Sequence, residues 1–404
     1  MSQYRAYPAY KDSGIEWIGQ VPEHWKVARV KRLASLRNER RNDVSTDTIY
    51  IGLEDVEAGS GQYKPTNGSS RQSEDSTVGI FYEGDVLYGK LRPYLRKAII
   101  SEMAGCCSTE FLVLRAEKTE PKWLQEWLLT PDVTHQIESG CEGAKMPRAD
   151  WWHIGSIEVV YPDQHEQAQI LTTLDRETAR IDALIEKKTR FIELLKEKVI
   201  ATAMTEQMYG DGEHIRLRHL VQIISRPVQL ISEDEYIALG LYNRGRGLFH
   251  KPPTLGKDIG DSDFFYVEEG DLILSGQFAW EGAVTMASST ESGCVVSHRY
   301  PIVRGGAVAT EYLFALLMTN FGDFLLNESS RGSAGRNRPL NIDLLLNEKI
   351  RMPSVKTQEE IKGLIKLKAT LEEKVKHSID LLKERRAAFI TAAVTGQIDL
   401  RGKQ

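Results

Sequence analysis

Two long stretches of the chain place hydrophobic residues at alternating spacings of three and four positions. The first runs from Leu171 to Val199 and the second from Ile361 to Phe389. Seven of nine such positions in the first stretch and six of nine in the second are apolar. This spacing is typical of coiled-coil helices. It predicts two long helices that pack on each other through the seam residues Leu171, Ile181, Ile185, Ile192, Leu195, Leu371, Val375, Leu382 and Phe389.

Three charged residues interrupt the predicted seam, namely Lys188, Lys368 and Arg385. A half-buried charge can fix the register of a coiled coil. Long basic side chains also extend along an apolar surface to bring their charge to water, and we favour this second interpretation.

The segment before each predicted helix has a different pattern. Short runs of Val, Ile, Tyr and Phe are broken by Gly, Asp and Asn, as in GDVLYGK (84–90) and GDLILSG (270–276). Such runs predict short strands and tight turns. Each strand-rich segment closes on a proline, Pro162 or Pro353, directly before its helix.

The chain repeats itself once, at a distance of about 190 residues. Six blocks match in the same order, among them IELLKEKVIATAMTEQ (192–207) with IDLLKERRAAFITAAVTGQ (379–397). The repeat predicts an α+β protein with two related, mixed, strand-rich domains separated by an antiparallel two-helix coiled coil with a pseudo-two-fold axis. The expected boundaries are a first domain at 1–162, a central helical spacer at 163–210, a second domain at 211–353 and a C-terminal helical spacer at 354–404.

Composition restricts the class of protein. The 404 residues are 41% hydrophobic and 27% charged, and no apolar run is long enough to span a membrane. The start of the chain lacks the core of a signal peptide. Four cysteines without CxxC spacing indicate neither a zinc site nor a disulfide framework, so we expect a cytoplasmic protein.

The net charge of −5 gives no indication of a nucleic-acid partner, but the distribution of charge does. Residues 28–41 (ARVKRLASLRNERR) contain six Arg or Lys and one Glu. Other short basic stretches contain glycine: GKLRPYLRK (89–97), YNRGRG (242–247) and SRGSAGRNRP (330–339). Basic loops on an acidic chain predict a protein that binds a polyanion on one face.

The loop GKLRPYLRK is the strongest candidate for contact with a nucleic acid. Lys90 and Arg92 can reach phosphates or guanine edges, and Tyr94 can contact a sugar or a base. Arg96 extends the same basic loop. The competing interpretation is an ordinary solvated hairpin loop. The matching segment of the second repeat, GQFAWEGA (276–283), is not basic, and there Gln277 can pair with adenine.

Two further groups of cations are candidates for phosphate contact. The first comprises glycine-flanked cations that precede the last strand of each repeat, for which support of a coil end is the alternative: Lys145, Arg148, Arg336 and Arg338. The second comprises arginines near apolar segments, for which a solvated charged face is the alternative: Arg37, Arg40, Arg41, Arg244 and Arg246. We expect the tryptophans to anchor cores or domain packing: Trp17, Trp25, Trp123, Trp127, Trp151, Trp152 and Trp280.

Signatures of catalysis do not occur in the sequence. There is no GxxxxGK[ST] phosphate loop, no NPPY-like methyltransferase tetrad, no HExxH metal spacing and no GxSxG nucleophile elbow. We therefore predict no catalytic residue and no metal ligand, and a chain that is not itself an enzyme.

The chain resembles the specificity subunit of type I restriction–modification systems. The resemblance rests on YKDSGIEWIGQVPEHW (10–25), GKLRPYL (89–95), the P-x-x-x-E-Q helix start (Pro162, Glu166, Gln167) and LLKERRAAFITAAVTGQID (381–399). It implies two target-recognition domains that read a bipartite, asymmetric site on double-stranded DNA. It also implies a coil that binds two modification (methyltransferase) subunits, which restriction (motor and nuclease) subunits then join.

The same resemblance implies no cofactor for this chain. S-adenosylmethionine, ATP and magnesium would belong to the partner subunits. Two alternatives remain: a self-contained nuclease or methylase, and a coiled-coil scaffold whose globular ends bind protein partners.

Overall fold

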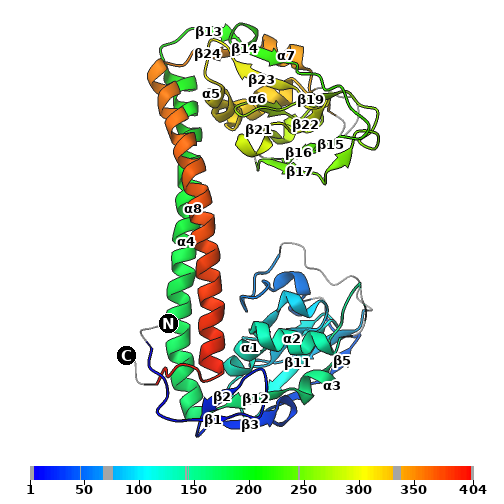
Figure 1. Ribbon diagram of the computed structural model, residues 1–404, viewed down its shortest axis with the longest axis vertical. Helices are drawn as coiled ribbons and strands as arrows, with labels where there is room; N and C mark the ends of the chain where they lie inside the picture. Colours follow the sequence, from blue (N-terminus) through cyan, green and yellow to red (C-terminus); the bar gives the residue numbers. More distant parts are fainter. Residues whose placement is uncertain are drawn as a thin grey trace. The chain divides into compact units, whose positions relative to one another are not determined.

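The computed structural model describes residues 4–45, 47–66, 76–141, 143, 145–243, 246–330 and 338–401 (Figure 1). The chain divides into two compact units. Unit 1 contains Met1–Glu186 and Ser378–Gln404, and unit 2 contains Lys187–His377. Each unit therefore holds one strand-rich domain and one half of each long helix.

Unit 1 contains two four-stranded sheets with the orders β5-β7-β10-β6 and β4-β11-β8-β9. Shorter pairs, β1-β2 and β12-β3, flank them. The strands are β1 Tyr10–Asp12, β2 Gln20–Pro22, β3 Lys26–Arg29, β4 Ala34–Leu36, β5 Arg40–Arg41, β6 Tyr50–Ile51, β7 Val78–Phe81, β8 Val86–Gly89, β9 Ala98–Ile100, β10 Gly105–Cys107, β11 Phe111–Ala116 and β12 Glu158–Tyr161.

Three short helices complete the first domain: α1 Pro121–Leu129, α2 Pro131–Ser139 and α3 Trp151–Ser156. α1 and α2 each begin with a proline, whose fixed φ suits the first helical position. Leu124, Trp127 and Leu128 of α1 pack with Val86 and Leu114 of the second sheet, so α1 covers one face of that sheet. Three 3-10 turns also occur, at Val30–Arg32 (η1), Leu53–Asp55 (η2) and Pro93–Leu95 (η3).

Among the described residues, unit 2 repeats this plan with one four-stranded sheet and several two-stranded pairs. Its largest sheet has the order β14-β23-β20-β21. The strands are β13 His214–Arg216, β14 Val221–Ile224, β15 Glu235–Tyr236, β16 Leu239–Leu241, β17 Leu248–His250, β18 Thr254–Leu255, β19 Phe264–Tyr266, β20 Leu272–Leu274, β21 Val284–Met286, β22 Val295–Ser297, β23 Ile302–Gly305 and β24 Lys349–Arg351. The helices are α5 Thr310–Leu317, α6 Asn320–Glu328 and α7 Ile342–Asn347, with 3-10 turns η4 Leu217–His219, η5 Ala279–Glu281 and η6 Ser289–Glu291.

The matched Gly-Asp motifs form the same turn in both domains. Gly84 and Gly270 have φ of +82° and +84°, a left-handed conformation that favours glycine. The Asp85 carboxylate accepts a hydrogen bond from the N–H of Tyr82 at 2.9 Å. Asp271 accepts the equivalent bond from the N–H of Glu268 at 2.8 Å. Equal turns at matched positions support the duplication inferred from the sequence.

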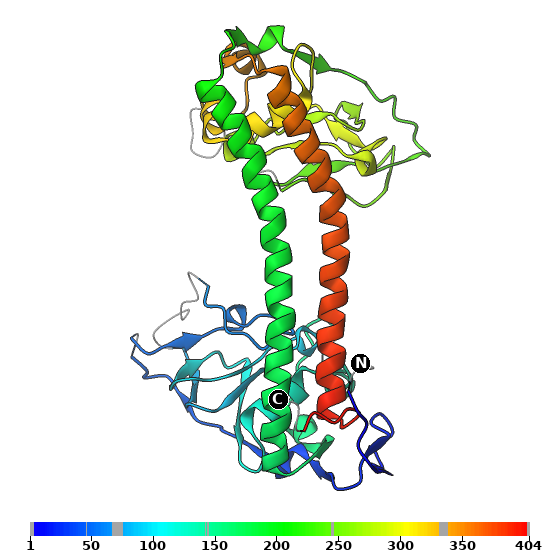
Figure 2. The ribbon, with the colours of Figure 1, turned by 90° about the vertical axis from the view of Figure 1, so that its left-hand side faces the viewer.

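Two long helices cross the boundary between the units. α4 spans Gln164–Tyr209 and α8 spans Val355–Val394. Within each unit the halves of α4 and α8 run antiparallel and next to each other (Figures 1 and 2). The predicted fold class, α+β with two repeated strand-rich domains and an antiparallel coiled coil, is confirmed. α8 begins at Val355, before the apolar seam that starts at Ile361 and next to the expected spacer boundary at 354, and it includes Gly363.

The coil residues expected from the spacing lie on the inner side of the helices. Leu171, Ile181 and Phe389 are buried. The others are half-buried: Ile185, Ile192, Leu195, Leu371, Val375 and Leu382. Of the three interrupting charges, Lys188 and Lys368 are half-buried at the seam, whereas Arg385 is exposed and its neighbour Arg386 takes the inner position. The placement of Arg385 in the seam was therefore wrong.

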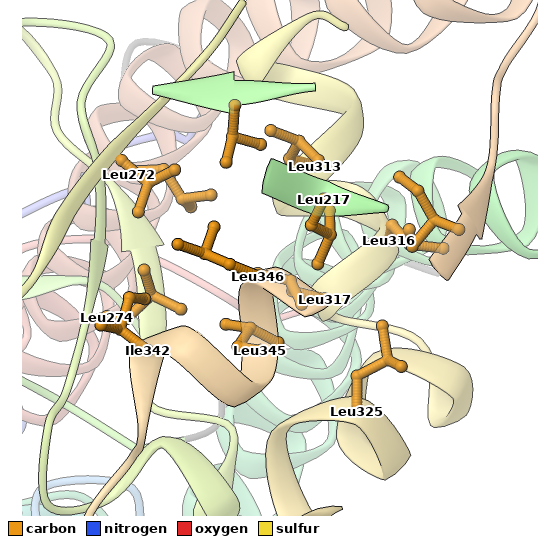
Figure 3. Close-up of a pocket in the computed structure, with 13 residues that line it drawn as sticks. Leu217, Leu272, Leu274, Leu313, Leu316, Leu317, Leu325, Ile342, Leu345 and Leu346 are labelled. Atoms are coloured by element: carbon orange, nitrogen blue, oxygen red, sulfur yellow. The ribbon is translucent and has the colours of Figure 1, made fainter. Parts of the chain in front are cut away.

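The core of unit 2 encloses a small cavity of about 30 Å³ (Figure 3). Only Leu, Ile and Val side chains line it, including Leu272, Leu316 and Leu345. A gap of this size without a polar group is a packing defect of an aliphatic core, not a ligand site.

The tryptophans divide into three groups, of which the half-buried one comprises Trp17, Trp151 and Trp280. Trp25, Trp123 and Trp127 are buried, as expected for core anchors. Trp152 is 87% exposed at the start of α3, with the Nζ of Lys31 5.8 Å from its ring centroid. The expectation that every tryptophan anchors a core was wrong for Trp152.

Candidate nucleic-acid interface

Two arginines in the GKLRPYLRK loop adopt a strained backbone conformation. Arg92 has φ 53° and Arg96 has φ 48°, on either side of η3. They are the only non-glycine residues with positive φ in the described part of the chain. Non-glycine residues in this region carry a free-energy penalty of about 1 kcal/mol or more, and they cluster at functional sites. The strain marks this loop as a candidate site.

The structure joins this loop to the second basic segment of unit 1. The N–H of Arg92 donates to the carbonyl of Pro147 at 2.9 Å, and the N–H of Ala149 donates to the carbonyl of Lys90 at 2.9 Å. Leu91 and Arg148 form an antiparallel β-bridge. Two candidate segments that are about 55 residues apart in the sequence therefore form one surface.

The cations of this surface differ in their pairing. The guanidinium of Arg148 pairs with Glu110 at 3.2 Å, and this hydrogen bond raises the pKa of Arg148. Lys90, Arg92 and Lys145 form no ion pair with any described residue. Arg92 and Lys145 are exposed, and Tyr94 is half exposed. These side chains are available to an external anion.

Arg96 is directed back onto its own domain. Its Nη1 donates to the carbonyl of Leu129 at 3.4 Å, and its carbonyl accepts from the N–H of Gly59 at 3.0 Å. The Nζ of the neighbouring Lys97 donates to the carbonyl of Leu53 at 2.6 Å. A third segment, residues 53–59, is thereby tied to the basic loop.

Unit 2 builds an equivalent surface from different side chains. The N–H of Leu340 donates to the carbonyl of Gly276 at 2.8 Å, which matches the bond from Ala149 to Lys90. Gln277 is exposed, and its carbonyl accepts from Nε1 of Trp280 at 3.2 Å. The guanidinium of Arg338 lies 5.5 Å from the Trp280 ring centroid, a cation–π distance.

The loop between β16 and β17 joins the same surface. The side-chain amide of Asn243 donates to the carboxylate of Glu281 in η5. Arg246 donates from Nε to the carbonyl of Asn243 at 3.1 Å, and its guanidinium lies over the Tyr242 ring at 5.4 Å. Both domains therefore bring three loops together, and the residues on those loops differ.

Other predicted contacts are not part of these surfaces. The guanidinium of Arg37 is held by Asp85 at 2.8 Å, and this hydrogen bond raises the pKa of Arg37. Arg41 pairs with Glu39 at 2.7 Å on the exposed strand β5. None of the described contacts brings either arginine to the three loops. Arg244 and Arg336 lie outside the described residues.

Sequence reasoning missed the acidic partners of these loops. Glu110 and Glu281 pair with Arg148 and Asn243 but carry no motif of their own. It also missed Arg226, which occupies the place of Arg37 in unit 2. The repeated Gly-Asp motif could have predicted both arginines. A buried Asp in each copy needs a cation nearby, and Arg37 and Arg226 supply it.

No group of three or more His, Cys, Asp or Glu side chains in the described ranges could hold a metal ion. None of the described helices combines the length and the apolar character needed to cross a membrane.

Comparison with known proteins gives a distant relative and a shared fold. The chain is 24% identical over 183 residues to the type I restriction enzyme EcoDI specificity subunit of Escherichia coli, an alignment that covers 44% of this chain and 41% of that protein. No protein-family model matches the chain.

One solved structure is similar over nearly the whole chain. It comes from work on complex assembly and conformational transition of the type I R-M system, and the alignment covers 95% of this chain and 99% of the other. The TM-score is 0.56 at 17% sequence identity, so this likeness concerns the fold. The resemblance predicted from the sequence motifs is confirmed: this chain is similar to specificity subunits of type I restriction enzymes.

Proposed function

We propose that this chain is the DNA-sequence-recognition subunit of a type I restriction–modification complex. It reads a bipartite, asymmetric site on double-stranded DNA, one half with each strand-rich domain. The chain itself is not catalytic. It acts in the cytoplasm and scaffolds two methyltransferase subunits and the restriction subunits, to which S-adenosylmethionine, ATP and magnesium belong.

One observation carries the proposal. In unit 1 the N–H of Ala149 donates to the carbonyl of Lys90, and in unit 2 the N–H of Leu340 donates to the carbonyl of Gly276. The backbone frame that holds the candidate loops is therefore alike in the two units. The side chains on the frames differ, with Lys90, Arg92 and Tyr94 in one and Gln277 and Trp280 in the other. A common frame that presents different hydrogen-bonding groups suits two readers of different base sequences.

The DNA contacts follow from the exposed groups. Lys90, Arg92, Lys145 and Arg148 contact phosphates or guanine in one half-site. Gln277, Arg246 and Arg338 serve the other half-site, where the amide of Gln277 matches adenine. The seam residues of α4 and α8 build the coil to which the methyltransferase subunits bind.

Methylome sequencing tests the proposal. Cells would express a neighbouring methyltransferase subunit with and without this chain. We expect a new two-part asymmetric motif with a fixed gap only when the chain is present. A palindromic motif, or no motif beside a demonstrably active methyltransferase, would contradict the proposal and favour a scaffold for protein partners.

A substitution identifies which domain reads which half. Gln277→Ala should relax one position in one half-site and leave the other half unchanged. Asn327→Ala, a nearby exposed amide that donates to the Trp280 carbonyl, is the matched control and should leave both halves unchanged. Equal relaxation of both halves would remove Gln277 from base recognition.

A further inference from the structure

A buried glutamine ties the start of α4 to the first domain. Gln167 lies in the first turn of the helix and is fully buried. Its Nε2 donates to the carbonyl of Pro162 at 3.1 Å. Its Oε1 accepts from the hydroxyl of Thr119 and from the N–H of Glu120, both at 2.9 Å. Glu120 is the N-cap of α1, so one amide connects two helix starts.

The second repeat contains the same connection. Gln358, in the first turn of α8, donates from Nε2 to the carbonyl of Pro353 at 3.1 Å. Its Oε1 accepts from the N–H of Ala309 at 2.7 Å. Ala309 is the N-cap of α5, the helix that matches α1. The donor distance to the proline carbonyl is the same in both copies.

The surroundings of the two amides have diverged. Beside Gln167, Glu166 accepts from His24 at 2.7 Å and from Trp25 at 3.2 Å. Beside Gln358, Thr357 donates to Glu206 at 2.7 Å. The amide is therefore a shared element in a region where neighbouring contacts differ.

The chemistry explains why the residue is glutamine. Only a primary amide offers a donor and an acceptor at the end of a side chain of this length. Glutamate would keep the acceptor and lose the donor to proline, and alanine would leave the N-cap N–H of the short helix without its partner.

The direction of a long helix is sensitive to its first turn. The 46 residues of α4 correspond to a length of about 69 Å at about 1.5 Å per residue. A tilt of about 3° at one end moves the other end by about 3.6 Å, close to the DNA step of about 3.4 Å per base pair. Small angular freedom at the start of the helix therefore produces a displacement of the size of one base-pair step.

We propose that Gln167 and Gln358 are positioning residues that fix the direction in which each long helix leaves its recognition domain, and thereby fix the gap between the two half-sites. This inference rests on the proposed function. It assigns specificity for the gap to two amides that lie outside the DNA-contacting loops.

A plasmid library tests the proposal. It carries the two half-sites at the natural gap and at gaps shorter or longer by one and two base pairs, and methylation is counted at each gap for the complex assembled with its methyltransferase. The wild-type chain should methylate one gap. Gln167→Ala and Gln358→Ala should raise methylation at the neighbouring gaps at least fivefold relative to the natural gap, with unchanged half-site bases. Gln169→Ala, an exposed amide two residues further along α4, is the matched control and should retain the single gap.

Three results separate the possibilities. A folded Gln358→Ala complex that retains the single gap overturns the inference, as does a loss of methylation that is equal at all gaps. If Gln167→Ala does not fold, Thr119→Val is the substitute in unit 1. It removes one donor to the same Oε1 and should allow methylation at the neighbouring gaps. Absence of any bipartite motif for the wild-type chain would instead refute the proposed function.

Discussion

Nη1 of Arg226 lies 2.8 Å from Oδ2 of Asp271, and the same pair recurs in the other unit, where Nε of Arg37 lies 2.8 Å from Oδ2 of Asp85. Both aspartates are buried. Asp271 also pairs with Nε of Arg304 at 2.6 Å. Arg37 and Arg226 each follow an edge strand, β4 or β14, and each aspartate precedes β8 or β20 of the same sheet. The duplicated pairs therefore tie these strands together in the sheet from which the candidate DNA loop extends.

We expect Asp271→Asn to destabilise unit 2. Among the described residues, the substitution leaves Arg226 and Arg304 with only the exposed carboxylate of Glu268 as counter-charge. Removal of one partner of a buried pair costs up to about 3 kcal/mol. Urea denaturation followed by circular dichroism measures this change. Glu197→Gln, which removes an exposed partner of Arg190, is the control and should leave the unfolding midpoint unchanged. Equal midpoints for the two variants would show that the Asp271 cluster is not a stabilising element.

Arg92→Gly should separate folding from DNA binding. Glycine adopts φ near 53° without strain, so the thermal unfolding midpoint should stay the same or rise. Loss of the guanidinium should weaken DNA binding by the assembled complex about tenfold, equivalent to about 1.4 kcal/mol, and reduce the salt slope by about one. Fluorescence anisotropy at several salt concentrations measures both. An unchanged salt slope would exclude Arg92 as a phosphate contact.

Cys107 should resist alkylation in the native protein. Burial in strand β10 raises the pKa of its thiol to about 12, so at pH 8 only about one molecule in 10⁴ carries the reactive thiolate. Reactivity should rise as the pH approaches 12. Cys141 is only half-buried and should be modified first by iodoacetamide. Mass spectrometry of timed samples compares the two sites, and equal rates at pH 8 would contradict the burial of Cys107.

Asp182 of α4 and Arg386 of α8 form an ion pair at 3.0 Å within unit 1. Exchange of the two residues should restore this ion pair. Asp182→Arg and Arg386→Asp should each lower the thermal midpoint, and the double exchange should restore part of the loss. We expect a coupling free energy of about 0.5–1 kcal/mol from the double-mutant cycle. Arg385→Asp at the exposed neighbour should show no coupling to Asp182.

The contrast between Arg385 and Arg386 shows where sequence reasoning fails. A strict seven-residue pattern and a helix of 3.6 residues per turn separate by about 20° per heptad. Near the end of α8 the inner face is therefore wider than one seam position per turn, and it includes Arg386 and Ile390 beside Leu382 and Phe389. The apolar spacing therefore predicted the two helices and most of their inner faces, but assigned the last basic position to the wrong neighbour.

For the candidate loops too, the sequence predicted some features and not others. The repeat predicted that residues 143–148 and 332–339 occupy equivalent places before the last strand of each copy. That the first segment joins the Lys90 loop depends on backbone bonds to Pro147 and Ala149, which have no local signature. Composition also gave no means of separating Trp151 from the exposed Trp152, because adjacent residues at a helix start face different directions.

The division of the chain has a consequence for its synthesis. Unit 2 is one continuous run from Lys187 to His377, whereas unit 1 needs both the early and the late residues. Phe389, Val394 and Leu400 pack against Tyr7, Val21 and Trp25 in a single core. On the ribosome, unit 2 therefore has all its residues before the core that joins the two ends of the chain in unit 1 can form. During translation, the part of the chain that is synthesised first therefore completes its core last.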